Sequence, residues 1–174
     1  LTQIPADRLE QLHQQVAQAI EAIYGDDWQQ DAVLAYHWHR AGAADKALAR
    51  YLKAGQAATR MHALVEAREH FAAALQMLDR LPDTMDNRRQ RVDTQLMLAS
   101  ISLMAERSVH AVARMQSSEL LLDSLREAGE ETREDRVRLI KIQFWKGRGH
   151  YVNGEYSSAI VCYQRASEIA QEID

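Results

Sequence analysis

The feature that most constrains this chain is the return of apolar residues at steps of three and four, in one run after another. Residues at these steps share one face of an α-helix, so each run predicts an amphipathic helix. The runs end at Gly25, Gly42, Pro82, Gly129 and Gly154, residue types that stop helices. The predicted helices cover about 6–24, the segment from Asp27 to Gly42, 44–60, 63–81, 87–105, 109–128, 132–152 and 156–172.

These eight predicted helices give an all-α chain. No run alternates as a strand would, and the scarcity of proline (two residues) and the frequent alanines favour helix. The connections are only a few residues long, so successive helices are expected to lie antiparallel as hairpins. The 174 residues fit a single helical-repeat domain, 1–174. Within it, 1–42 holds N-terminal helices that form a junction to an upstream domain, and 43–174 holds three long hairpins.

Charge, cysteine content and hydropathy exclude several classes of function. A net charge of -4 provides no general attraction for nucleic acid, and no nucleic-acid partner is expected. The longest apolar runs fall short of the roughly 20 residues that cross a bilayer. The one cysteine, Cys162, has no internal disulfide partner, so a cytoplasmic location is predicted. Because the chain begins at Leu1 and ends in a helical pattern, we expect it to be part of a larger protein.

A pattern of small and large residues recurs along the chain. Gly55, Ala99 and Gly147 lie 44 and 48 residues apart, each in the first helix of a predicted hairpin. Close crossing of two helices requires small residues at the contact, and the large residue one turn on is expected to fill the groove toward the next hairpin. At offsets of 12, 16 and 19, the three segments have Ala67, Phe71 and Ala74; Ala111, Met115 and Ser118; and Ala159, Tyr163 and Ala166.

This pattern resembles the tetratricopeptide consensus, and the segment Gly147 to Ala166 matches it best, with Gly154, Glu155 and Tyr156 at its turn. The middle unit departs from it, with Ser102 where an aromatic is usual, and the spacing exceeds the family's period of about 34 residues, which indicates longer helices. The resemblance implies a right-handed superhelix of stacked hairpins. A second match has the residues Leu34, Ala35, Trp38, Gly42, Ala47, Tyr51 and Ala54.

The N-terminal part also resembles the helical arms that follow the ATPase core in bacterial signal-transduction ATPases and in related cyclase or transcription-regulator proteins. The segments that carry this resemblance are Leu12 to Tyr24 and Ala32 to Arg60. It implies an ATP-binding domain upstream in the parent protein and no cofactor in this segment.

Candidate catalytic and metal-binding residues do not assemble into a site. His37 and His39 are two apart, so on a helix they point in nearly opposite directions and cannot readily share a metal. Cys162 has no identified base and is predicted to be a buried, inert thiol. The stretch from Gly147 to Gly154 lacks the preceding strand and the lysine of a phosphate loop. The chain is therefore predicted not to be an enzyme.

Charged clusters and tryptophans have structural interpretations. The carboxylate-rich run from Glu127 to Asp135 is predicted to be a solvated loop and helix start. A second cluster consists of arginines near the start of a predicted helix. Arginines there oppose the helix dipole and attract anions, but a solvated helix start is the preferred interpretation of this arginine cluster. Its members are Arg88, Arg89 and Arg91, and the tryptophans predicted to pack are Trp28, Trp38 and Trp145.

The function predicted from these patterns is recognition of a protein or peptide, or of another domain of the same chain, by a regulatory module. Basic groove residues would suit a peptide with an acidic end. The alternatives are a free-standing adaptor, or a small-molecule sensor with an apolar pocket near Phe144, Trp145 and Tyr151. By offset from Gly55, Ala99 and Gly147, the tetratricopeptide resemblance implies six groove residues: Gln56, Arg60, Asp93, Lys141, Arg148 and Tyr151.

Overall fold

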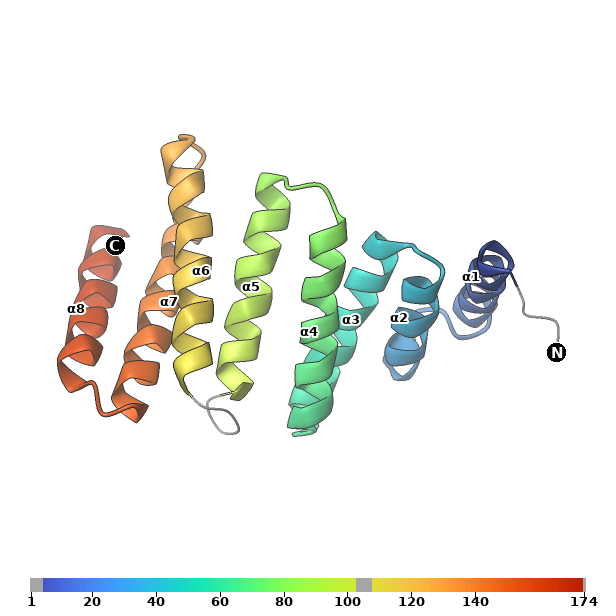
Figure 1. The fold of residues 1–174 in the computed structure, drawn as a ribbon, viewed down its shortest axis with the longest axis horizontal. Coiled ribbons are helices and arrows are strands. Elements are labelled where there is room, and N and C mark those ends of the chain that lie inside the picture. The colour runs from blue at the N-terminus through green and yellow to red at the C-terminus, as the bar shows by residue number, and fades with distance from the viewer. Residues whose placement is uncertain (1–4, 103–107, 174) are drawn as a thin grey trace. The chain divides into compact units, whose positions relative to one another are not determined.

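The computed structural model describes residues 5–102 and 108–173, and over these ranges the chain is all-α, as predicted (Figure 1). It contains eight α-helices and one short 3-10 helix there, and no strand. The helices are α1 (Ala6–Tyr24), α2 (Asp31–Arg40), α3 (Ala44–Arg60), α4 (Leu64–Arg80), α5 (Met85–Ser102), α6 (Ser108–Glu127), α7 (Arg133–Val152) and α8 (Tyr156–Ile173), and the 3-10 helix is η1 (Trp28–Gln30).

Local signals in the sequence explain where these helices begin and end. The predicted capping box at the start of α7 is present, because Thr132 accepts from the backbone of Asp135 and the Asp135 side chain accepts from the backbone of Thr132. Gly154 adopts a φ of 78° after α7, where a side chain would be strained. The predicted second helix begins later than expected, since Asp27 caps η1 and α2 follows from Asp31.

The chain divides into two compact units, Leu1–Pro82 and Asp83–Asp174. Unit 1 holds α1 to α4, and unit 2 holds α5 to α8. Within each unit successive helices pack side by side, so that α3 pairs with both α2 and α4, and α7 pairs with both α6 and α8 (Figure 1). The single repeat domain expected from the sequence stays a prediction.

The small-to-large pattern forms direct contacts inside the hairpins. A Cβ added to Gly55 would lie 2.6 Å from the Phe71 ring, and one added to Gly147 would lie 2.7 Å from the Tyr163 ring. The large side chain therefore packs on the small residue of its own hairpin, and the expectation that it fills the groove toward the next hairpin stays a prediction. In the middle hairpin, Ala99 and Met115 lie in one core cluster.

Two ion networks connect helices that are distant in sequence. In unit 1, Arg50 of α3 binds Glu21 of α1 at 3.0 Å and the buried Asp31 of α2 at 2.9 Å. In unit 2, the buried Asp135 of α7 accepts hydrogen bonds from Arg89 of α5 and from Arg138. Each network thus ties neighbouring helices together through charge-assisted hydrogen bonds.

Ion pairs of unit 2 correct two predictions about charged segments. Asp135 is 1% exposed, so the run from Glu127 to Asp135 is not solvated throughout. The arginine cluster is engaged inside unit 2, since Arg88 binds Asp83 through two nitrogens and Arg89 binds Asp135. Carboxylates of the chain itself supply the anions that arginines at a helix start attract.

Candidate binding surface

The six nominated groove residues fall in both units. Gln56 and Arg60 lie exposed on α3 of unit 1. The other four belong to unit 2, which therefore provides the larger candidate surface. They are Asp93 of α5 and Lys141, Arg148 and Tyr151 of α7.

The three α7 candidates lie on one exposed face, together with Phe144. Lys141, Phe144, Arg148 and Tyr151 follow one another at steps of three and four, which places them on one side of the helix. All four are exposed, while α7 buries Leu139 and other residues on its opposite side. The neighbours of α7 cover that opposite side, so the nominated side chains are left facing outward.

Within the part of the chain that the structure describes, the two cations on this face have no carboxylate partner. Lys141 and Arg148 form no ion pair with any residue in the described ranges, whereas Lys146 on the same helix binds Glu119 of α6 at 2.6 Å. An exposed cation without a partner can bind an external carboxylate without first breaking an internal bond. Lys141 and Arg148 are therefore the basic groups best placed to contact a partner.

Asp93 is already engaged. Its two carboxylate oxygens accept from Arg138 of α7 at 2.8 and 2.9 Å, which is the two-pronged geometry that arginine and carboxylate favour. The same Arg138 also binds the buried Asp135. Asp93 thus holds α5 to α7 and contributes little free charge to the candidate surface.

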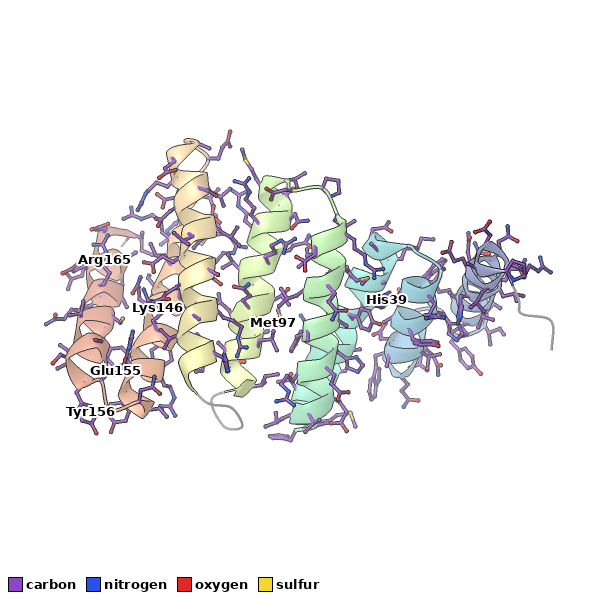
Figure 2. All side chains as sticks on the ribbon, in the orientation of Figure 1. His39, Met97, Lys146, Glu155, Tyr156 and Arg165 are labelled. Carbon is purple, nitrogen blue, oxygen red and sulfur yellow. The ribbon has the colours of Figure 1, made fainter. Side chains whose placement is uncertain are left out.

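Helix α8 adds exposed residues that the sequence reasoning missed. The Tyr163 ring lies 6.1 Å from the Phe144 ring, and the Tyr156 ring lies 5.6 Å from the Tyr151 ring. Ile160 stands between Tyr156 and Tyr163 on the same face of α8. Figure 2 shows Tyr156 beside Glu155 at the turn between α7 and α8. The signal was available, because residues 156, 160 and 163 follow the helical step.

The structure arranges these aromatic residues differently from the apolar pocket that the small-molecule-sensor alternative predicted. Phe144 and Tyr151 are exposed, and Trp145 is half-buried against the core of unit 2. Phe144 and Trp145 meet edge to face at 5.2 Å. These three aromatic residues therefore line a surface and do not enclose a cavity. A hollow of about 250 Å³ lies elsewhere in unit 2, lined by Arg126, Glu131, Arg136, Leu139, Arg165, Ile169 and Glu172.

His37 and His39, the two histidines weighed as metal ligands, each have a hydrogen-bonding partner within unit 1. The Nδ1 atoms of His13 and His37 are 2.9 Å apart, and His39 Nδ1 lies 3.0 Å from the Tyr51 hydroxyl. Burial lowers the pKa of His37 and of His39, and His13 lowers the pKa of His37 further. In the part of the chain described, no group of three His, Cys, Asp or Glu residues is arranged to hold a metal.

Cys162 is buried, as predicted, and burial raises the pKa of its thiol. A raised pKa leaves little thiolate at neutral pH, so this sulfur is a poor nucleophile. Among the tryptophans, Trp38 is buried and Trp145 is half-buried, as predicted. Trp28 is about half exposed, so the prediction that it packs holds only in part.

Comparison with known proteins leaves the surface without an assigned role. No protein-family model matches the chain, and no curated protein matches it either. Over residues 5–102 and 108–173, no helix has both the length and the apolar character needed to cross a membrane.

Proposed function

We propose that this chain is a non-catalytic helical-repeat module that recognises a protein or peptide segment through the exposed face of α7. The observation that carries the proposal is the juxtaposition of Lys141, Phe144, Arg148 and Tyr151, two unpaired cations alternating with two exposed aromatic rings. Aromatic residues and arginine are the side chains that most often dominate binding energy at protein interfaces. Cations next to them favour a partner with carboxylates.

The resemblance to helical arms of bacterial regulators supports a place for this module in a cytoplasmic regulatory protein. In that arrangement, partner binding on the arm biases a switch in another domain, and ATP is the ligand of the upstream domain. Translation of the gene upstream of Leu1 tests this part of the proposal. A GxxxxGK[ST] segment between a strand and a helix is the expected finding, and a gene without one would leave a free-standing adaptor.

The binding surface itself is tested with peptides selected from a displayed random library on the immobilised chain. The Lys141→Glu, Arg148→Glu double variant is expected to bind the selected peptides about tenfold or more weakly. The reversed charges repel the peptide carboxylates that the two cations of the unaltered chain attract. Arg165→Glu is the matched control, since it reverses an exposed arginine of α8 that pairs with Glu168. Circular dichroism checks the fold of each variant. Selected peptides that bind the double variant as well as the unaltered chain would reject the α7 face.

A further inference from the structure

The exposed surface of the last hairpin is wider than the α7 face alone. We define the α7–α8 patch as Phe144, Arg148 and Tyr151 of α7 with Tyr156, Ile160 and Tyr163 of α8. Its five apolar members have between 37% and 61% of their surface exposed. A contiguous group of large, exposed apolar side chains is typical of an interaction site. Exposed apolar residues that have no such role are usually scattered singly over the surface.

The patch has a regular geometry. Two aromatic pairs cross from α7 to α8, Phe144 with Tyr163 and Tyr151 with Tyr156. Seven residues separate the pairs on each helix, or about 10.5 Å along the axis. Arg148 lies between the pairs on α7, and Ile160 lies between them on α8. The surface therefore presents ring, cation and ring along one helix and ring, aliphatic side chain and ring along the other.

We propose that the α7–α8 patch binds an amphipathic helix of a partner protein, with apolar residues seven apart over the two aromatic pairs and a carboxylate between them on Arg148. This inference rests on the proposed binding function and specifies its partner. A helix repeats its face every seven residues, about 10.5 Å, which matches the separation of the pairs. A second carboxylate, two turns from the first, reaches Lys141, which lies beside the patch three residues before Phe144 on α7.

Charge selects this occupant over a second copy of the chain. Two copies related by a two-fold axis would bring the same patch together, with a cation from each copy and no carboxylate among the patch residues themselves. The nearest acidic group by sequence, Glu155, is held by His150, whose Nδ1 lies 2.5 Å from its Oε2. An acidic partner helix, in contrast, satisfies both Lys141 and Arg148 while covering the rings.

A pair of designed peptides tests the partner's chemistry. Each is a helix-stapled segment of about 14 residues with leucines at i and i+7, and the two differ only in having glutamate or lysine at i+4. The glutamate peptide is expected to bind at least about tenfold more tightly than the lysine peptide, and Arg148→Glu is expected to reverse this preference. Equal binding of the two peptides, or no binding of the glutamate peptide, would overturn the proposal.

A second variant pair tests the contribution of α8. Ile160→Glu is expected to weaken binding of the glutamate peptide by about tenfold or more. Val161→Glu changes a neighbour on another face that is 64% exposed, against 56% for Ile160, and is expected to leave binding unchanged. If library-selected peptides depend on Lys141 and Arg148 but are insensitive to Ile160→Glu, the inference fails and the proposed function stands. If they are insensitive to all three substitutions, both fail. Self-association of the chain that is lost in Ile160→Glu would assign the patch to a second copy.

Discussion

Both units join helices that are distant in sequence through buried charge. The central group of the network is a cation in unit 1 and a carboxylate in unit 2. Unit 1 places one cation, Arg50, between the carboxylates of Glu21 and Asp31. Unit 2 places one carboxylate, Asp135, between the guanidinium groups of Arg89 and Arg138. The buried carboxylate is the group whose charge would be left unpaired if an arginine were removed. It has one arginine partner in unit 1 and two in unit 2.

A similar contrast separates the two glycine contacts. Phe71 packs on Gly55 and is 2% exposed, so the ring is confined on every side. Tyr163 packs on Gly147 but is 37% exposed, so this ring has solvent on one side. The same local pattern therefore produces a rigid contact in unit 1 and a more adaptable one in unit 2, because a ring at the surface can move outward.

The largest expected effect comes from removing one arginine from each network. Arg50→Met leaves Asp31, 2% exposed, without its arginine and is expected to lower the free energy of unfolding by about 4 kcal/mol. Arg89→Met leaves Asp135 paired with Arg138 and is expected to cost only about 1 to 2 kcal/mol.

Urea unfolding measures both losses. Tryptophan fluorescence reports unit 1 in a Trp145→Phe background, which keeps Trp28 and Trp38, and hydrogen exchange over α5 to α8 reports unit 2. Met preserves much of the apolar volume of the arginine stem, so the comparison isolates the charge. Equal losses for the two variants would mean that the number of arginines around the buried carboxylate does not control stability.

A smaller effect is expected from adding one methyl group at each glycine. Gly55→Ala forces a Cβ to within 2.6 Å of a confined ring and is expected to destabilise unit 1 by about 2 kcal/mol. Gly147→Ala is expected to cost about 1 kcal/mol or less, because Tyr163 can shift toward solvent and alanine favours the helix. Thermal unfolding of both variants checks the order, and a larger loss for Gly147→Ala would contradict it.

Acidification is expected to act first on unit 1, through its histidines. Burial lowers the pKa of His37, His39 and His70 in the folded chain. The unfolded chain therefore binds more protons below its histidine pKa of about 6.5, so stability is present above that pH and falls as the pH is lowered toward 5. Fluorescence-detected urea unfolding at pH 7 and pH 5 in the Trp145→Phe background measures this change.

The contribution of Asp135 in unit 2 is expected to persist over the same interval. Burial raises the pKa of Asp135, but hydrogen bonds from Arg89 and Thr132 outweigh burial and leave the pKa below its ordinary value. A carboxylate with a lowered pKa contributes stability that is lost only as the pH falls below about 4.

His37→Asn is the control for unit 1, and it should reduce the loss of stability between pH 7 and pH 5. A loss that is unchanged by this substitution would count against His37.

The smallest expected effect concerns Cys162. Its burial and raised pKa predict slow reaction with a thiol reagent such as Ellman's reagent in the folded chain, and ordinary reaction in urea. The ratio of the two rates at pH 8 measures the protection. A folded-state rate close to that in urea would show that α8 opens readily. It would then add to the difference between the rigid ring contact of unit 1 and the adaptable one of the last hairpin.

The helices and their packing residues were largely predictable from the sequence, because both depend on neighbours along the chain. Apolar steps of three and four located the eight helices of residues 5–102 and 108–173, and Thr132 with Asp135 identified the cap of α7. The spacing identified Gly55, Phe71, Gly147 and Tyr163 as packing residues, but the contact of each ring with the glycine of its own hairpin came from the structure. These features follow from backbone geometry and steric size, which act within one hairpin.

Only the tertiary structure decided which charges are buried and which apolar residues remain exposed. The chain order alone did not reveal that Arg89 meets Asp135 across 46 residues, because an exposed and a buried carboxylate look the same in sequence. Nor did it reveal that Tyr156 and Ile160 stay uncovered, since their helical spacing is the one expected of a packed face. Burial depends on which helices come together, and electrostatic and apolar contacts between helices depend on that arrangement.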